Sequence, residues 1–416
     1  MKSESLLKDS TILFFASIVA NVFNLLYQLF MARNLEPVDF GVLNMLLSLL
    51  VVTSVPVNVL QTVTAKFMAT FKADNYLNKI SLFLRVFFKR ALISGLALFL
   101  FVLISSGKIA AFFKIQNRFP VIMSGLIMMV STILPFNLGG LQGLQKFKGL
   151  GATLIISGGL RLLFGIVLVN FGLKVSGALG AIVLGSIAAV LFSSILLKTS
   201  FAWPEKDAAG FDDGKLDFKA IYKFALPILV ALPSFSLLTN MDVIFVKHLF
   251  SPLEAGYYSI AQMVGKVIFF LPSAVIIVMF PKASANYARN ENTTYILKKC
   301  LIIIGLLCFS ASGFCIIFPE LVLKMLSGRA YLECIPLIAP FSISMSFFAL
   351  INAFLFYHLS VNNLKFIYIF LAAAAIQVIL ILLFHGTLLE VLYILVGCSI
   401  LLFLINCVSL RRLAKR

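Results

Sequence analysis

Residues 11–32 read TILFFASIVANVFNLLYQLFMA and contain no charged side chain. About 20 mostly apolar residues are enough for a helix to span a bilayer. The run is longer than the roughly 7–15 residues of a signal-peptide core, and no small-residue cleavage site follows it. We therefore expect residues 11–32 to be retained as the first transmembrane helix of the protein.

Similar apolar runs recur along the whole chain. Of its 416 residues, 61% are hydrophobic and 12% are charged, whereas soluble domains average about 45–50% and about 25%. This composition predicts an all-α integral membrane protein with about twelve transmembrane helices, rather than a soluble enzyme. The eleven further predicted spans are 41–64, 86–105, 121–141, 151–171, 176–197, 221–247, 256–280, 298–318, 335–357, 365–385 and 388–410.

The basic residues predict how the helices are oriented. If the N-terminus is inside and the spans alternate, 24 of the 34 Lys and Arg residues lie in inner segments and eight in outer segments. Because inner loops of membrane proteins are enriched in Lys and Arg, this bias predicts that both termini are cytoplasmic. The net charge of +18 is thus explained by topology, and we expect no nucleic-acid partner.

Residues of the first half recur in the second half at an offset of 214–216. Six helices separate the copies, so the two halves share one orientation and form a parallel repeat. We predict two six-helix bundles around a central cavity, with halves 1–197 and 220–416 joined by a cytoplasmic linker, 198–219. Such repeats are typical of transporters that work by alternating access. The matching pairs are Arg33 with Lys247, Pro37 with Pro252, Gly41 with Gly256, Pro56 with Pro272, Lys66 with Lys282, and Asn137 with Asn352.

Four segments resemble the Wzx-type flippases of the multidrug/oligosaccharidyl-lipid/polysaccharide exporter superfamily. ARNLEPVDFGVLNMLLSLL (32–50) resembles the family signature A-R-x-L-G-P-x-x-Y/F-G, with Glu36 in place of the usual Gly. NMDVIFVKHLFSPLEAGYYSIAQMV (240–264) resembles the signature of the seventh and eighth helices. FNLGGLQGLQKF (136–147) and FGLKVSGALGAIVLGSI (171–187) resemble the fourth helix and the fifth-to-sixth hairpin. Many relatives have fourteen helices, against the twelve expected here.

The resemblance implies a transporter of the cell membrane that turns a lipid-linked oligosaccharide from the inner to the outer leaflet for surface polysaccharide biosynthesis. Its cargo would be carried on a polyprenyl diphosphate. Its partners would be membrane lipids, a polysaccharide polymerase and glycosyltransferases.

Three charged residues fall within predicted spans, where charge is costly and usually functional. Arg161 and Lys266 each lie about ten residues into a span, and Asp242 lies toward the outer end of the seventh. Asp242 and Lys266 are at similar depth, so one interpretation is an ion pair between them. Arg161 has no acidic residue in the spans of its own half. We predict that it binds the diphosphate, because the planar guanidinium makes two parallel hydrogen bonds to phosphate.

Polar and proline residues complete the predicted transport path. Asn21, Asn24 and Gln28 share one face of the first helix and could bind sugar hydroxyls, and Gln142 lies near the inner end of the fourth. Packing between helices explains these amides equally well. Pro56, Pro227, Pro233 and Pro272 are predicted to bend helices along the path, as hinges for gating.

Two other functions remain possible from the sequence. A cation-coupled multidrug or organic-cation antiporter needs a buried carboxylate without a cationic neighbour. A saccharide polymerase needs catalytic residues on a substantial outer loop, and the predicted outer loops are short. The six cysteines and three histidines form no metal-binding motif. We expect no cofactor, with coupling to a proton or sodium gradient as one possibility through Asp242.

Overall fold

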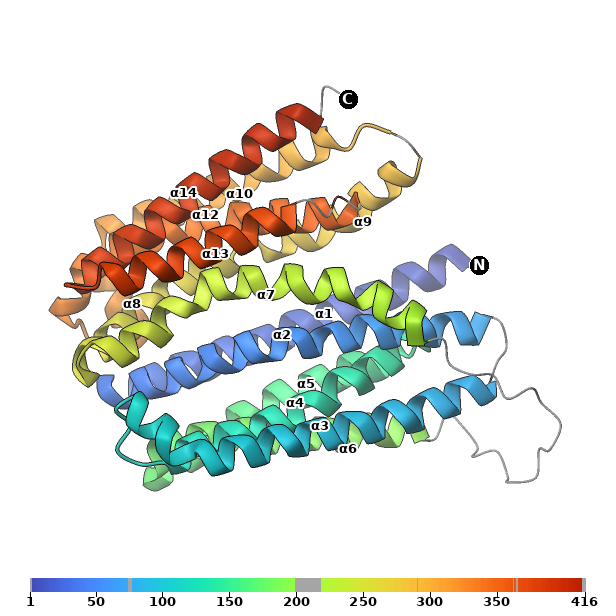
Figure 1. The fold of residues 1–416 in the computed structure, drawn as a ribbon, viewed down its shortest axis with the longest axis horizontal. Helices are drawn as coiled ribbons and strands as arrows, with labels where there is room; N and C mark the ends of the chain where they lie inside the picture. The colour runs from blue at the N-terminus through green and yellow to red at the C-terminus, as the bar shows by residue number, and fades with distance from the viewer. Residues whose placement is uncertain are drawn as a thin grey trace. The chain divides into compact units, whose positions relative to one another are not determined.

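The computed structural model describes residues 2–73, 77–198, 218–289, 291–361, 363 and 366–413. Within these ranges every regular element is helical and no strand is present. The described residues divide into two compact units (Figure 1). The predicted linker lies almost entirely outside them. The helices before it are α1 (Lys2–Asn34), α2 (Pro37–Ala73), α3 (Leu77–Phe112), α4 (Phe119–Gly143), α5 (Phe147–Leu168), η1 (Val169–Leu173) and α6 (Lys174–Lys198).

The helices after the linker are shorter on average than those before it. They are α7 (Phe218–Leu249), α8 (Pro252–Phe270), α9 (Ser273–Ala288), α10 (Thr294–Ile317), α11 (Pro319–Ser327), η2 (Leu332–Cys334), α12 (Ile335–Ser360), α13 (Phe366–Leu383) and α14 (Leu388–Leu413).

Eleven of the twelve predicted runs fall mainly on helix in the described residues, whereas the run 256–280 covers two helices, α8 and α9, with a turn at residues 271–272 between them. Nine helical stretches in the described residues are long and apolar enough to cross a membrane, which makes this a multi-pass membrane protein. One of the nine, Phe147–Lys198, holds two helices, α5 and α6. The chain turns between them at Gly172 (φ 82°) and Lys174 (φ 43°), which lie in the left-handed region. The total of twelve spans and the cytoplasmic position of the termini remain predictions.

The first unit comprises residues 1–35 and 50–229, and the second comprises residues 36–49 and 230–416. The start of α2 therefore groups with helices that follow it by more than 200 residues. The proposed division into halves 1–197 and 220–416 remains a prediction, as does the central cavity.

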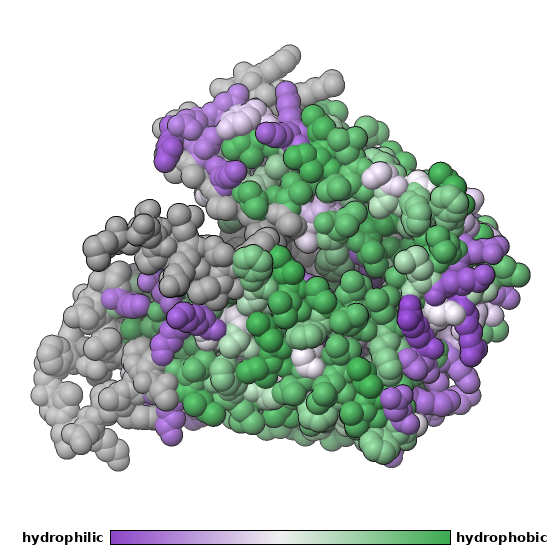
Figure 2. Space-filling view, turned by 180° about the vertical axis from the view of Figure 1, so that it is seen from behind, coloured by the Kyte–Doolittle hydropathy of each residue, from purple (hydrophilic) through white to green (hydrophobic). Residues whose placement is uncertain are grey.

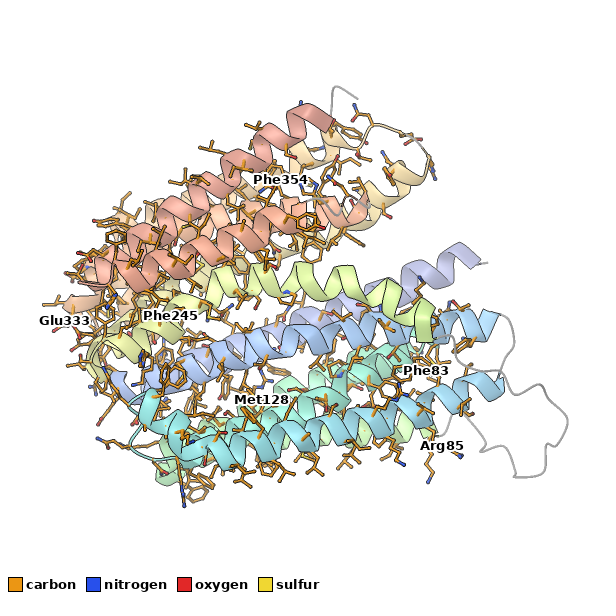
Figure 3. All side chains as sticks on the ribbon, in the orientation of Figure 1. Phe83, Arg85, Met128, Phe245, Glu333 and Phe354 are labelled. Atoms are coloured by element: carbon orange, nitrogen blue, oxygen red, sulfur yellow. The ribbon has the colours of Figure 1, made fainter. Side chains whose placement is uncertain are left out.

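Each unit has an apolar core of its own. In the first unit, α2 to α6 enclose Phe83 and Phe136, and Phe83 stacks on Phe87 with ring centroids 4.2 Å apart. In the second unit, α12 packs against α8, α10 and α14 and buries Phe348 and Phe354 completely. Figure 3 labels Phe83 and Phe354 within these cores.

The outward faces of the helices are also apolar. Ile104, Phe171 and Leu306 are each at least 70% exposed, and Figure 2 shows hydrophobic side chains over the helices with hydrophilic ones near their ends. Large exposed apolar surfaces are unfavourable in water. They fit helices surrounded by lipid, where the backbone satisfies its own hydrogen bonds.

Candidate functional site

Arg161 on α5 lies against α1 in the first unit. Its Nη1 donates a hydrogen bond to Asn24 Oδ1 at 2.9 Å, and its guanidinium carbon lies 6.0 Å from the ring centroid of Tyr27. The Tyr27 hydroxyl in turn donates to the carbonyl oxygen of Ala178 on α6 at 2.9 Å. The structure thus brings two predicted site residues, Arg161 and Asn24, into contact and adds Tyr27 to them.

Glycines allow the backbones of α1, α5 and α6 to approach closely around this arginine. A Cβ on Gly185 would lie 3.0 Å from the backbone nitrogen of Arg161 and 2.8 Å from the carbonyl oxygen of Ser157. A Cβ on Gly158 would lie 3.2 Å from the carbonyl oxygen of Ala20. Small residues at helix contacts are the usual means of close packing in membranes. This packing fixes the height of Arg161 relative to Asn24 and Tyr27.

The charge of Arg161 is not balanced within its surroundings. Residues 77–198 contain no Asp or Glu, and Arg161 forms no ion pair with any described residue. Its Nε is buried and, within the described part of the chain, makes no hydrogen bond. One donor of the guanidinium is therefore unsatisfied by the described residues.

The other predicted amides differ in their surroundings. Asn21 is exposed and Gln28 is partly buried, and neither side chain hydrogen-bonds to a described residue. Gln142 Oε1 accepts a long bond of 3.4 Å from Gln61 Nε2. Of the four predicted amides, Asn24 is the one that hydrogen-bonds to Arg161 in the described part of the chain.

A second polar cluster lies in the second unit, around Asp242 on α7. The Asp242 carboxylate is fully buried. It accepts hydrogen bonds from the Tyr258 hydroxyl at 3.0 Å and from Gln262 Nε2 at 3.2 Å. Gln262 Oε1 accepts a bond from Asn44 Nδ2 on α2 at 2.8 Å. We call these four residues, Asn44, Asp242, Tyr258 and Gln262, the carboxylate cluster.

The suggested ion pair between Asp242 and Lys266 is not formed. Lys266 Nζ instead lies 3.5 Å from Ser48 Oγ on α2, and no salt bridge joins the two described side chains. Neutral donors surround the carboxylate because the face of α8 turned toward α7 carries Tyr258 and Gln262.

Sequence reasoning missed Tyr27, Tyr258, Gln262, Asn44 and Ser48. A signal for most of them was present. Tyr258, Gln262 and Lys266 are spaced four residues apart and form one polar stripe on α8. Asn44 and Ser48 have the same spacing on α2. Polar stripes on otherwise apolar helices predict contact with another helix rather than with lipid.

The start of α2 meets α8 at two glycines of the internal repeat. A Cβ on Gly41 would lie 3.0 Å from the Cα of Gly256, and a Cβ on Gly256 would overlap the carbonyl oxygen of Pro37. The α8 helix begins with a capping box, in which Ser251 and Glu254 each accept from the other's backbone N–H. Because the capping box fixes where α8 begins, Tyr258 and Gln262 of the carboxylate cluster lie within two turns of the contact between Gly41 and Gly256.

The predicted hinge prolines occupy different positions. Pro272 lies in the turn that separates α8 from α9, as expected for a residue that cannot continue a helix ladder. Pro233 lies inside the continuous α7. The side chains of Pro56 and Pro227 lie outside the described part of the structure. A gating role for the four prolines remains a prediction.

No metal site emerges from the residues that the structure describes. No group of three or more His, Cys, Asp or Glu side chains there could hold an ion. None of the six cysteines forms a disulfide within the described residues.

Comparison with known proteins identifies both a family and a fold. A family model described as polysaccharide biosynthesis protein matches residues 30–336. An uncharacterized membrane protein of Methanocaldococcus jannaschii is 24% identical over 257 residues, which are 55% of this chain and 56% of that protein. The chain thus aligns with little more than half the length of this relative.

Several solved structures share the fold at low sequence identity. An inward-facing multidrug resistance MATE family transporter of the MOP superfamily has a TM-score of 0.75 at 13% identity, over 95% of this chain and 96% of that chain. The lipid II flippase MurJ, inward closed, has a TM-score of 0.72 at 14% identity, over 97% and 87%. The eukaryotic MATE transporter AtDTX14 has a TM-score of 0.65 at 12% identity, over 97% and 95%. These relatives are transporters or flippases rather than enzymes.

Proposed function

Because this chain belongs to the polysaccharide biosynthesis protein family and is a membrane transporter of the multidrug/oligosaccharidyl-lipid/polysaccharide exporter superfamily, we propose that it flips a lipid-linked oligosaccharide. The cargo is carried on a polyprenyl diphosphate and moves from the inner to the outer leaflet of the cell membrane. There it becomes available for surface polysaccharide synthesis. Glycosyltransferases would supply this substrate, and a polymerase would consume it.

The observation that carries this proposal is the unbalanced charge of Arg161. An unpaired charge within an apolar span costs several kcal/mol, roughly 2.5–3.5 on insertion scales. Such a residue usually faces a cavity or a ligand. Arg161 lies in a 52-residue apolar stretch that contains two helices and has no acid between residues 77 and 198. A diphosphate would supply the missing negative charge.

The surroundings of Arg161 fit diphosphate recognition. Asn24 holds one Nη donor, and the Tyr27 ring lies beside the guanidinium, so the side chain is oriented before any ligand binds. The unbonded Nε and the remaining Nη donors give a planar fork, which matches two phosphate oxygens. Asn21 and Gln28, on the same helix as Asn24, are without hydrogen bonds to described residues and could contact the attached sugars.

We propose that the carboxylate cluster couples transport to a cation gradient. Asp242 is buried and bonded only by neutral groups, Tyr258 and Gln262, so a proton or sodium ion could neutralise it. Binding of that cation in one conformation and its release in another would bias the alternation of access.

A multidrug or organic-cation antiporter is the second candidate. The observation that favours it is the same Asp242 carboxylate, which has no ion pair to a described residue and could exchange a proton for an organic cation. Arg161 argues against it, since a cation in the transport path repels organic cations. Drug susceptibility of a deletion strain separates the two candidates. Unchanged susceptibility together with loss of surface polysaccharide supports the flippase.

The test of the flippase proposal is substitution of Arg161 in the native host. We expect Arg161→Ala to reduce surface polysaccharide at least tenfold and to leave the protein level in the membrane unchanged. Arg161→Lys should retain part of the activity, because lysine keeps the charge and loses the fork. Arg118→Ala is the matched control, since Arg118 is exposed in the same unit. Normal polysaccharide in the Arg161→Ala strain would contradict the proposal.

A further inference from the structure

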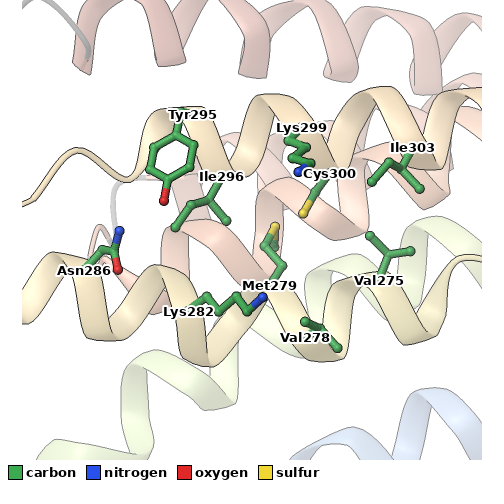
Figure 4. A pocket seen from close by; sticks show the side chains of 10 residues that line it. All are labelled: Val275, Val278, Met279, Lys282, Asn286, Tyr295, Ile296, Lys299, Cys300 and Ile303. Atoms are coloured by element: carbon green, nitrogen blue, oxygen red, sulfur yellow. The ribbon is translucent and has the colours of Figure 1, made fainter.

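A pocket of about 590 Å³ lies between α9 and α10 in the second unit, and Figure 4 shows it from close by. Its volume is within the roughly 300–1,000 Å³ typical of small-molecule sites. The ten lining residues are Val275, Val278, Met279, Lys282, Asn286, Tyr295, Ile296, Lys299, Cys300 and Ile303.

The lining changes from polar to apolar along the pocket. The two helices run antiparallel, so Asn286 on α9 lies near Tyr295 on α10 at one end. Val275 and Ile303 face each other at the other end. Between the two ends lie both lysines of the pocket, Lys282 from α9 and Lys299 from α10 (Figure 4).

The pocket is positively charged. Its lining contains two lysines and no Asp or Glu. Both ammonium groups are on exposed side chains and come from different helices, so one phosphate between them could contact both. Asn286 and Tyr295 offer an amide and a hydroxyl for further hydrogen bonds to a polar headgroup.

The pocket lies at the end of the helices that the charge distribution predicts to be cytoplasmic. Lys282 and Lys299 flank the connection between α9 and α10, which is one of the predicted inner segments. The inner leaflet carries the anionic lipids of many membranes, and basic pockets between transmembrane helices bind their headgroups.

We propose that this pocket binds an anionic phospholipid of the inner leaflet. The phosphate lies between Lys282 and Lys299, and the headgroup extends toward Asn286 and Tyr295. One acyl chain runs along the apolar end of the pocket, past Val275 and Ile303. The lipid joins α9 to α10 where their side chains leave space. This inference does not depend on what the protein transports.

The test is native mass spectrometry of the full-length protein in detergent, titrated with phosphatidylglycerol or with phosphatidylcholine. We expect phosphatidylglycerol to bind more tightly than phosphatidylcholine. We also expect each chain to bind one phosphatidylglycerol fewer when the pocket lysines are replaced. Each lysine near an anionic lipid contributes about 1 kcal/mol, which is about fivefold. Lys299→Gln should therefore weaken this lipid about fivefold, and Lys282→Gln with Lys299→Gln about 25-fold.

Two control variants make the test specific to the pocket. Lys298→Gln removes an exposed charge from the adjacent position outside the pocket and should change the affinity less than twofold. Ile303→Trp should block the acyl chain, whereas Ile302→Trp, at a 64% exposed position outside the pocket, should not. Sodium phosphate, added at the same concentration as the lipid, should not displace phosphatidylglycerol from the pocket.

Three results would overturn the proposal. The first is equal binding of phosphatidylcholine and phosphatidylglycerol, and the second is an equal effect of Lys298→Gln and Lys299→Gln. The third is tighter binding of undecaprenyl diphosphate than of phosphatidylglycerol at this pocket, which would assign it to a prenyl diphosphate instead.

Discussion

Replacing Gln262 by methionine would remove the amide that links Asn44 to Asp242. Methionine is similar in length and flexible, so the variant keeps most of the packing of α8. Two hydrogen bonds are lost, at 2.8 Å to Asn44 and at 3.2 Å to Asp242. The amide of Asn44 then has no acceptor in the cluster, and the Tyr258 hydroxyl is the one cluster side chain that still donates to the buried carboxylate.

The size of the effect follows from these two bonds. A buried polar group left without a partner costs about 1–3 kcal/mol, while hydrogen bonds between membrane helices average about 0.6 and reach about 1.7 kcal/mol. We expect a loss of about 1–3 kcal/mol in unfolding free energy. The second unit has about 200 residues, for which 1 kcal/mol shifts the melting midpoint by about 2–4 °C. The expected decrease is therefore about 2–12 °C.

The assay is thermal unfolding of the purified protein in one detergent, followed by thiol-reactive dye fluorescence and by size-exclusion chromatography of heated samples. Gln142→Met is the matched control, because Gln142 is exposed and has only a 3.4 Å bond to Gln61. It should shift the midpoint by less than about 2 °C, because surface substitutions usually change the unfolding free energy by no more than about 0.5 kcal/mol.

A double-mutant cycle with Asn44→Leu sharpens the test. The double variant removes both partners of the 2.8 Å bond, so its destabilisation should be smaller than the sum of the two single changes. Two outcomes would refute the reasoning: a Gln262→Met midpoint no lower than that of Gln142→Met, or full additivity in the cycle.

Three further predictions concern charge and packing. Asp242→Asn keeps the shape of the side chain and removes its titrating group. Flipping of a labelled lipid-linked saccharide in proteoliposomes should then no longer respond to an imposed proton or sodium gradient. A retained response would exclude Asp242 as the coupling group. Asn24→Asp places a carboxylate 2.9 Å from the Arg161 guanidinium. The resulting ion pair should raise the melting midpoint and lower the rate of flipping at least tenfold. An undiminished rate would argue against the proposal that the charge of Arg161 is needed for the cargo. Gly256→Ala forces its new methyl group against the backbone of Pro37 and should lower the unfolding free energy by about 1–3 kcal/mol. Gly305→Ala is the control. Its Cβ position has open space around it, so the melting midpoint should be unchanged or higher.

Hydropathy placed eleven of the twelve predicted runs on helices, because a bilayer leaves few alternatives for an apolar run of this length; it did not show that the run 256–280 is divided between α8 and α9. The turn at Pro272 could also be anticipated from the missing N–H of proline. Hydrophobic periodicity could not give the rotation of each helix, and only the polar stripes on α2 and α8 pointed to it. In a membrane protein every face of a helix is largely apolar, so hydrophobic periodicity does not show which side meets a neighbour.

The same limit left open whether Asp242 pairs with Lys266 or is bonded by neutral groups. The sequence shows that the two residues lie at similar depth in the membrane. It does not show whether their side chains point toward each other. The four-residue spacing of Tyr258, Gln262 and Lys266 would have shown that α8 offers the carboxylate neutral donors as well as a cation. For Arg161, sequence identified the missing acid, while its contact with Asn24 required the close approach of α1 and α5.

The contact between Gly41 and Gly256 has a consequence for biogenesis. These residues are 215 positions apart, and a ribosome adding about 5–20 residues per second needs about 10–40 s to make the second after the first. During that interval Asn44 on the new helix lacks the hydrogen-bond acceptor that Gln262 later provides. The start of α2 is therefore made before Asn44 can form its native hydrogen bond to Gln262. The second unit is completed late in translation, around a segment that was among the first to be made.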